Sequence, residues 1–234
     1  MCCMAPAITC RCWGWGKHEV RCGGGRRSVT TVGEIILSDE TGFPWNKAKL
    51  VESGVRHLRP FNISNDGQLD LAQTYFVPVE AATEAKASLV AGDVLFNNTN
   101  SVELVGKTAV VREPMAVAFS NHINRLRVRD VGRIEPRWLA LALRNLQEQG
   151  VFAAHCNRWI GQAGFSVTEL AHVDIPIPYP DDPALSLAEQ RRIVARLEAL
   201  LGEVEKARQL TKAMMREIEE TESSVLSYAF LGEL

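Results

Sequence analysis

The sequence predicts a mixed α+β globular domain followed by one long C-terminal coiled-coil helix. Short apolar runs separated by turn residues fill residues 28–183 and are typical of strands with a few helices between them. Residues 184–234 instead repeat apolar side chains at helical spacing and contain no proline. The chain has 234 residues, of which 46% are hydrophobic, which is enough to bury one core of ordinary size plus an appendage.

The first 27 residues differ in composition from the rest. They hold five of the six cysteines, and the later part of the chain has only Cys156. Cys10 and Cys12 are separated by a single residue, which is not zinc-knuckle spacing, and no Cys or His pair follows at finger spacing. We therefore expect residues 1–27 to be a disordered leader without a metal, for which a misassigned start is one explanation.

Composition points away from membranes and secretion. No stretch approaches the eighteen or so uninterrupted apolar residues that a spanning helix needs, and the head lacks the apolar run of a signal peptide. We expect a cytoplasmic protein with no membrane partner.

The net charge is −2, but residues 123–144 carry six arginines against two acidic residues. This local excess suits either phosphate contact or a solvated basic face.

Five strands are expected in the globular part, at residues 58–63, 94–97, 107–111, 116–120 and 123–128. Turn patterns at Gly67, Gly92 and Gly106 separate several of them. Side chains alternate across a strand, so Arg125 and Arg127 in the last of these strands should project from the same face.

Two helices are expected in the same part. The first begins at Pro136, a residue that suits the first helical position, and Gly150 can close its end. The second begins at Ser166, which forms a capping-box pattern with Glu169. Residues 174–183 then hold four prolines, and they predict an extended exit at a domain boundary.

The long helix is expected over residues 187–230, with Ser186 and Glu189 as its capping box. Alternating spacings of four and three residues define an apolar heptad seam of Ile193, Leu197, Leu200, Val204, Ala207, Thr211, Met214, Ile218, Thr221, Val225 and Tyr228. At about 1.5 Å per residue the helix spans roughly 65 Å, more than the domain needs to cover itself. We expect a partner helix on this seam; the alternative is a helix lying along its own domain.

The usual catalytic motifs are missing. The sequence has no G-x-G-x-x-G, Walker A, G-x-S-x-G or H-E-x-x-H pattern. Cys156 could act as a nucleophile with His155, His122 or His172 as base, but adjacent residues seldom face each other and a buried thiol is common. We expect no catalytic residue, metal or cofactor on this chain, with an uncharacterised hydrolase as the alternative.

Amide and basic side chains gather in the predicted loops and on the last strand. They are Asn97, Asn98, Asn100, Lys107, Asn121, His122, Asn124, Arg125, Arg127, Asn157, Arg158 and Gln162. Asn and Gln can pair with adenine, and Arg with guanine, so this set suits base reading in DNA. We expect Arg125, Arg127 and Lys107 to contact phosphates. The alternative is that these are ordinary turn residues.

Longer strings carry more information than these single residues. They are VGEII at residues 32–36, LRPFNISNDGQLDL at 58–71, LVAGDVLFNNTNSVELVGKTAVV at 89–111, FSNHINRLRV at 119–128, GQAGFSVTELAHVDIPIPYP at 161–180 and LAEQRRIVARLEALL at 187–201. In this order they resemble the DNA-specificity subunit of type I restriction-modification systems. The resemblance covers residues 31–234.

The resemblance implies a division of labour within a complex. Residues 28–183 would form a target recognition domain that reads one half of a split site in double-stranded DNA. Residues 184–234 would form a spacer helix that docks the modification subunits. Adenine methylation with S-adenosylmethionine, and cleavage with ATP and Mg²⁺, would belong to the modification and restriction subunits. This chain would be a recognition subunit without catalysis.

A complete family member carries two recognition domains and two such helices, whereas this sequence has one of each and no internal repeat. Two explanations stay open. The chain is a half-length protein that pairs with a second copy through its helix, or it is a fragment of a split gene. A homodimer would read a palindromic bipartite site. The alternative from another class is an α/β interaction scaffold that oligomerises through its helix and does not bind DNA.

Overall fold

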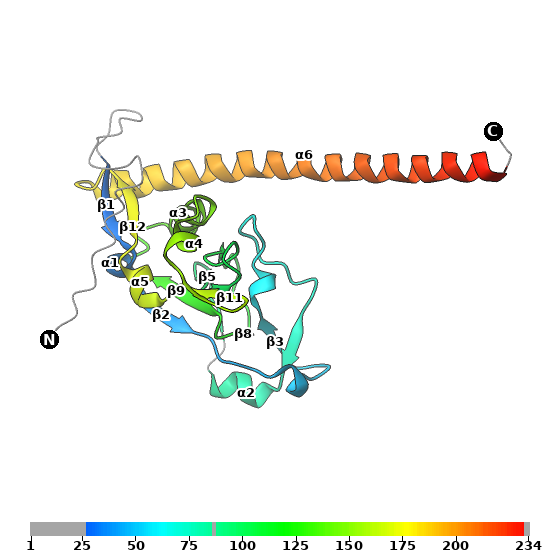
Figure 1. Ribbon diagram of the computed structural model, residues 1–234. Coiled ribbons are helices and arrows are strands. Elements are labelled where there is room, and N and C mark those ends of the chain that lie inside the picture. Colours follow the sequence, from blue (N-terminus) through cyan, green and yellow to red (C-terminus); the bar gives the residue numbers. More distant parts are fainter. Residues whose placement is uncertain (1–26, 86–87, 232–234) are drawn as a thin grey trace. The chain divides into compact units, whose positions relative to one another are not determined.

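The structure is a computed structural model, and it describes residues 27–85 and 88–231. It divides into two compact units, Met1–Arg191 and Arg192–Leu234, which are described separately. The predicted leader at residues 1–27 lies, apart from Arg27, outside the described residues. The first unit contains short strands and helices and the second is helical, so the predicted mixed α+β class with a long C-terminal helix is confirmed (Figure 1).

The strands, in chain order, are β1 (Arg27–Thr31), β2 (Ile36–Thr41), β3 (Val55–Leu58), β4 (Tyr75–Val77), β5 (Val94–Asn97), β6 (Thr99–Asn100), β7 (Thr108–Val110), β8 (Val117–Phe119), β9 (Ile123–Val128), β10 (Asn157–Trp159), β11 (Gln162–Gly164) and β12 (Asp174–Pro178). The helices are α1 (Val32–Ile35), α2 (Val79–Glu84), α3 (Pro136–Glu148), α4 (Val151–His155), α5 (Val167–Ala171) and α6 (Pro183–Leu231). Short 3-10 turns occupy Lys47–Lys49 and Pro60–Asn62.

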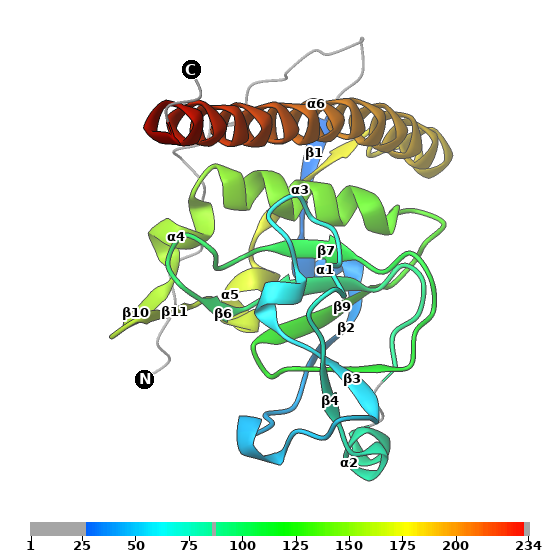
Figure 2. The same ribbon diagram turned by 90° about the vertical axis from the view of Figure 1, so that its right-hand side faces the viewer.

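The central sheet of the first unit has the order β2-β9-β5-β7 and is antiparallel (Figure 2). Strand β5 is buried on both faces, because its side chains point alternately into two different cores. Val94 and Phe96 face one core, Leu95 faces a second core, and all three side chains are fully buried. A strand buried on both faces needs apolar residues at successive positions, which explains the continuous apolar run in β5.

The first core lies between the central sheet and the helices. Leu139 and Leu143 of α3 contribute the helical side of it. The rings of Phe96, Phe152 and Phe165 meet edge to face, with centroids 5.1 Å apart for Phe96 and Phe152 and 4.9 Å apart for Phe152 and Phe165. Because Phe152 lies in α4 and Phe165 follows β11, this core anchors both ends of the segment that carries β10 and β11.

The second core lies on the opposite face of the central sheet. There the small sheet β4-β3-β8, with β3 and β8 parallel, packs against it. Leu58 and Phe119 of the small sheet join Leu95 and Ile123 of the central sheet. The first unit is therefore layered as helices, central sheet and small sheet.

A two-stranded ribbon joins the beginning of the first unit to its end. Strand β1 pairs antiparallel with β12, from Arg27 opposite Pro178 to Thr31 opposite Asp174. The indole N–H of Trp138 donates to the carbonyl oxygen of β12 residue 176 at 2.9 Å and so ties the ribbon to α3. A strand with one neighbour tolerates the prolines of β12, because no second strand needs their missing N–H.

Four of the five predicted strands are present. Residues 94–97 and 123–128 match β5 and β9 to the residue, and β7 and β8 lie within the other two predicted ranges. The strand predicted at residues 58–63 is wrong, because β3 ends at Leu58 and a 3-10 turn begins at Pro60. Proline has no N–H for a ladder, so the strand cannot continue through it.

The helix predictions for the first unit are confirmed with one change. Helix α3 begins at Pro136, and Gly150 follows it in the left-handed conformation. Ser166 and Glu169 form the predicted capping box of α5. The cap predicted at Ser186 is wrong, because α6 already begins at Pro183. The Asp182 carboxylate accepts from the Leu185 N–H at 3.0 Å, which is the bond that an N-cap makes to the third residue of its helix. The N-cap is therefore Asp182, four residues before Ser186.

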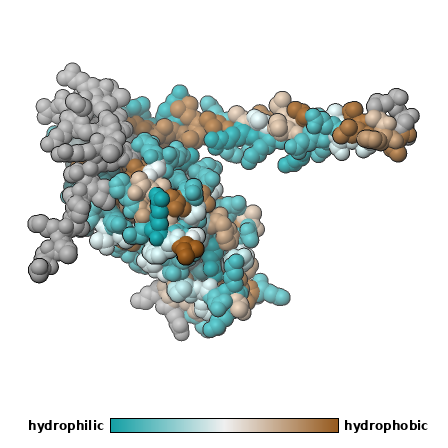
Figure 3. Space-filling model, in the orientation of Figure 1, coloured by the Kyte–Doolittle hydropathy of each residue, from teal (hydrophilic) through white to brown (hydrophobic). Residues whose placement is uncertain are grey.

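Helix α6 begins in the first unit and forms the second unit from Arg192 to Leu231. Most residues of the predicted seam have exposed side chains there, and Ile193 is half-buried. The large exposed members, each at least 38% exposed, are Leu197, Leu200, Val204, Met214, Ile218, Val225 and Tyr228. Hydrophobic side chains interrupt the hydrophilic ones along this helix (Figure 3). Among the described residues no helix is both long and apolar enough to cross a membrane.

Candidate nucleic-acid interface

The predicted amide residues at the end of β5 form a hydrogen-bonded network. Asn97 is fully buried, and its side-chain nitrogen donates to the carbonyl oxygens of Thr99 and His122 at 3.0 and 2.8 Å. Asn100 donates to Asn97 Oδ1 at 2.6 Å. These bonds hold the loop after β5 against the loop before β9, so residues far apart in the sequence meet here.

Asn98 and Asn124 extend this network toward β2. Asn98 Nδ2 donates to the carbonyl oxygen of Asn121 at 3.1 Å and also to Asn124 Oδ1. Asn124 is fully buried and donates to Thr41 Oγ1 at 2.8 Å. Because the donors of Asn97, Asn98 and Asn124 are used inside the protein, these side chains position the loops and present no free amide.

The β10–β11 hairpin lies beside the network and carries three further predicted residues. Strand β11 pairs with β6, where Ala163 lies opposite Asn100. Asn157, Arg158 and Gln162 are all exposed. Figure 2 shows this hairpin at the edge of the first unit. The structure therefore brings most of the predicted amides together around one hairpin.

An open depression of about 180 Å³ lies between the hairpin and the network. Its lining combines amide and hydroxyl groups with one indole ring: Thr41, Asn98, Asn124, Asn157, Trp159 and Ser166. Nearby, burial and the positive charge of Arg59 lower the pKa of His122, which favours a neutral imidazole. No charged side chain lines this depression, and its lining combines polar groups with the apolar side chains of Trp159, Phe165 and Val167.

Two of the three predicted phosphate contacts do not fit the structure. Arg125 is buried and pairs with Glu40, and Lys107 is buried with its ammonium donating to the carbonyl oxygen of Ile63. Arg127 donates to both carboxylate oxygens of the buried Asp93, at 2.7 and 2.9 Å, and this bond raises the pKa of the arginine. Arg125 and Arg127 do share one face of β9. Burial and internal partners give Arg125 and Lys107 a structural role, whereas the Arg127 side chain is 35% exposed and its phosphate contact stays a prediction.

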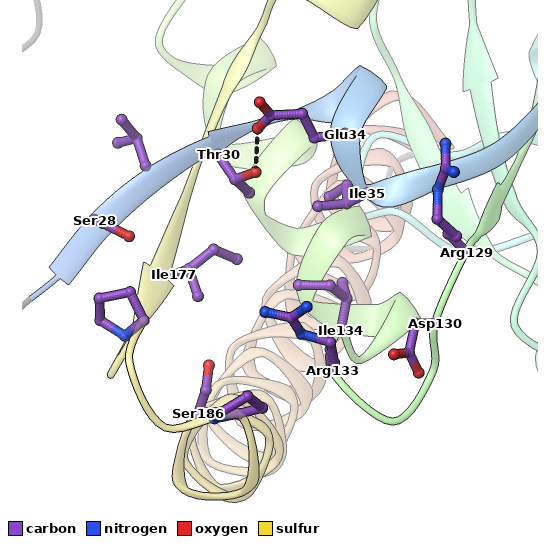
Figure 4. Close-up of a pocket in the computed structure, with 13 residues that line it drawn as sticks. Ser28, Thr30, Glu34, Ile35, Arg129, Asp130, Arg133, Ile134, Ile177 and Ser186 are labelled. Carbon is purple, nitrogen blue, oxygen red and sulfur yellow. Dashed lines mark hydrogen bonds between the residues drawn. The ribbon is translucent and has the colours of Figure 1, made fainter.

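A second hollow, of about 490 Å³, lies between the β1–β12 ribbon, the loop after β9 and the first turn of α6 (Figure 4). Arg129 and Arg133 face it together with Asp130 and Glu34. A hydrogen bond from Thr30 lowers the pKa of the Glu34 carboxyl. Charges of both signs line this hollow, so its electrostatics select neither an anion nor a cation.

Cys156 and His155 do not form a nucleophile and base. The Cys156 thiol donates to the carbonyl oxygen of Ala153 at 3.3 Å, and the His155 Nδ1 lies 3.0 Å from the carbonyl oxygen of Val151. Each group therefore contacts the backbone of α4 and not the other. In the described ranges, no group of three or more His, Cys, Asp or Glu residues is arranged to hold a metal ion.

Sequence reasoning missed the two apolar residues at the tip of the hairpin. Trp159 is 61% exposed and Ile160 is fully exposed. The glycine at position 161 was a sequence signal for a turn. In the structure Gly161 has a φ of +76°, a conformation that glycine adopts without strain. Three-residue strands on either side of a turn are too short to show an alternating pattern, which is why this segment was assigned to a loop.

Comparisons with known proteins indicate one family. A scan against protein-family models gives no match. Over 198 residues the chain is 27% identical to the type I restriction enzyme MjaX specificity subunit of Methanocaldococcus jannaschii, covering 82% of this chain and 44% of that protein. The chain resembles a type I specificity subunit. It is also 24% identical over 185 residues to the EcoBI specificity subunit of Escherichia coli, covering 79% of this chain and 36% of that one.

Solved structures of type I specificity subunits share the fold. The TM-score is 0.60, at 21% identity, with a chain from a study of assembly and conformational transition in the type I R-M system, covering 89% of this chain and 46% of that chain. It is 0.51 at 21% identity, with the same coverages, for the HsdS subunit of Thermoanaerobacter tengcongensis. For the M. genitalium S subunit it is 0.52 at 13% identity, covering 76% and 39%. The chain spans less than half the length of each of these relatives.

Proposed function

We propose that this chain is a DNA sequence-specificity subunit of a type I restriction-modification complex. The first unit would read one half of a bipartite site. The seam of α6 would dock modification subunits and a second specificity half. The supporting observation is the agreement of sequence and fold: similarity to specificity subunits extends over 82% of the chain, and the fold matches theirs over 89%.

Base reading is proposed for the exposed polar residues around the β10–β11 hairpin. Asn157, Arg158 and Gln162 have exposed side chains, and His122 and Asn100 are half-buried beside them. Amide groups present a donor and an acceptor side by side, which matches the edge of adenine in the major groove. The buried residues Asn97, Asn124, Lys107 and Arg125 would support this surface without contacting bases.

Partner docking is proposed for the seam of α6. Exposed apolar side chains repeated along such a length of helix favour burial against other helices. The chemistry of the complex would belong to the partners: the modification subunits would bind S-adenosylmethionine, and the restriction subunits would use ATP and Mg²⁺. This chain would contribute recognition without catalysis.

Selection from a pool of randomised duplex DNA tests this proposal. The full chain is assembled with the modification subunit of its system, and bound duplexes are sequenced after several rounds. We expect enrichment of a defined half-site, with an affinity that falls linearly with salt on a log–log scale, because phosphate contact releases counterions. Helix-driven assembly without any enriched sequence would instead support the interaction scaffold that does not bind DNA.

The docking function has its own variant. Ile218→Asp places a charge on the seam, and we expect it to reduce co-purification of the modification subunit or of a second copy of the chain. Gln209→Asp makes the same change in charge at an exposed position of the same helix outside the seam and serves as the control. Equal effects of the two variants would contradict docking through the seam.

A further inference from the structure

The tip of the β10–β11 hairpin displays two large apolar side chains to solvent. Ile160 has a relative exposure of 106% and Trp159 one of 61%. Single exposed apolar residues are common on protein surfaces, but two adjacent ones at the end of a ribbon form a compact apolar surface.

The β10–β11 hairpin holds this tip in a defined place. The Trp159 ring lies directly over Gly164, where a Cβ would come within 2.8 Å of the ring, so only glycine leaves room for the indole. Ala163 is fully buried, and the N–H of Phe165 donates to the carbonyl oxygen of Asn98 at 2.8 Å. The tip is therefore fixed both to the first core and to the amide network.

The two faces of the β10–β11 hairpin carry different side chains. Asn157 and Trp159 pair with Gly164 and Gln162, so Asn157, Trp159 and Gln162 share one face. In the part of the chain that the structure describes, neither Asn157 nor Gln162 uses its side chain in a hydrogen bond, unlike the amides of the network. Arg158 lies on the other face and donates to the carbonyl oxygen of Ala153 at 2.8 Å.

The charge around the tip permits contact with a nucleic acid. Residues 151–168 contain no Asp or Glu, so no carboxylate on this segment repels phosphate groups. Strand β6 pairs only with Ala163 and Gly164 of β11, so the hairpin extends past β6 as two strands, and two strands are narrow enough to enter the major groove of B-DNA. The free amides and the apolar tip would then face the edges of the base pairs.

We propose that the hairpin reads an A·T base pair in the major groove, an inference that rests on the proposed function. The Gln162 amide would pair with N6 and N7 of adenine, and Ile160 would pack on the 5-methyl group of thymine. On the face that Asn157, Trp159 and Gln162 share, no carboxylate could accept from cytosine and no arginine could read guanine, because Arg158 lies on the opposite face. The available chemistry therefore selects A·T.

Replacing thymine by uracil tests the contact, because uracil differs only by the missing methyl group. The full chain with its modification subunit is titrated with the selected duplex and with duplexes that carry uracil at one thymine position at a time. We expect one position at which uracil weakens binding about fourfold, the loss for one buried methyl group. Ile160→Ser should bind the thymine duplex about fourfold more weakly and should lose the difference between thymine and uracil.

Two further variants complete the test. Val131→Ser replaces another apolar residue of 61% exposure, outside the hairpin, and should keep the wild-type uracil profile. Gln162→Ala should lower discrimination against other bases at the paired adenine by roughly tenfold. Both variants should unfold at the same urea concentration as the wild-type chain.

The outcomes separate this inference from the proposed function. A chain that enriches a defined site but binds every uracil duplex as tightly as thymine overturns the hairpin contact alone. A chain that enriches no site overturns both. If Ile160→Ser weakens capture of the modification subunit and leaves the uracil profile unchanged, the tip is a protein contact and the proposal is wrong.

Discussion

Amide side chains around the end of β5 have two different environments. The Asn97 amide lies in the interior and bonds three groups, whereas the Asn157 amide points to solvent on the hairpin. Both residues were selected from the sequence as base readers, because composition identifies an amide but not its burial. Burial depends on loops that come together from residues 97–101 and 120–124, and no local pattern encodes that meeting.

Asn97→Ala should therefore destabilise the first unit. It leaves the carbonyl oxygens of Thr99 and His122 without their donor in a buried site, which costs about 1–3 kcal/mol. Urea unfolding followed by circular dichroism measures this loss. Asn157→Ala, the same substitution at an exposed position, should change the free energy of unfolding by less than about 0.5 kcal/mol. Similar values for the two variants would mean that the network does not stabilise the fold.

His57 gives the first unit a stability that depends on pH. The residue is fully buried, and its Nε2 lies 3.2 Å from the carbonyl oxygen of Phe43, while Nδ1 has no partner among the described residues. Burial, reinforced by the charge of Arg59, lowers its pKa from 6.5 to about 4. Protonation would place an unpaired N–H and a charge in the interior, so the folded state holds the neutral ring.

The sign of the pH effect follows from proton binding. Between pH 6.5 and about 4 the unfolded chain binds a proton at residue 57 and the folded chain does not, so stability falls as the pH falls through this window. Below about pH 4 the folded form also protonates and this contribution levels off. His57→Gln cannot titrate, and its unfolding midpoint should depend less on pH in this window. Parallel pH profiles for the two proteins would contradict this assignment.

At the scale of elements, prediction succeeded where burial is local and failed where it is not. The strand β5 is a continuous apolar run and β9 alternates toward two cores, so both were located to the residue. The ribbon of β1 and β12 joins segments more than 140 residues apart, and pairing at that distance leaves no local pattern. The hairpin strands β10 and β11 have three residues each, too few for any period to appear.

The beginning of α6 shows why its start was misplaced. Ser186 and Glu189 have capping-box spacing, but Ser186 is buried inside the helix and accepts from the side chain of Gln190. Gln190 also donates to the carbonyl oxygen of Arg133 and accepts from the Glu135 N–H, both at 3.0 Å. These bonds satisfy backbone groups next to α3, so the first turns of α6 complete the first unit.

Gln190→Ala should weaken this attachment. The substitution leaves the buried Glu135 N–H and the Arg133 carbonyl oxygen unpaired, and we expect a loss of about 1–3 kcal/mol in unfolding free energy. Thermal unfolding of the full chain measures it. Gln209→Ala provides the control within the same helix, because Gln209 is exposed and bonds only the side chain of Glu205. An equal loss for both variants would indicate a change in helix propensity and not a lost attachment.

At the scale of the whole molecule, the chain combines the first unit, for which DNA reading is proposed, with a helix that has an exposed apolar seam. It spans less than half of each specificity subunit that it matches. If two copies pair through α6, two-fold symmetry places the same reading unit at both ends of the assembly, and the preferred DNA is palindromic and bipartite. Pairing with a different specificity half would instead give two unlike half-sites.

Helix length should then set the gap between the half-sites. Inserting one heptad after Lys206 keeps the seam in phase and lengthens each helix by about 10 Å, which corresponds to roughly three base pairs of B-DNA. Selection from randomised duplexes should return the same half-sites with the gap increased by about three base pairs for each heptad of added separation. Inserting three residues at the same place turns the seam out of register, and it should lower both assembly and DNA retention. An unchanged gap in the heptad variant would mean that contacts within the reading units, and not α6, fix the spacing of the site.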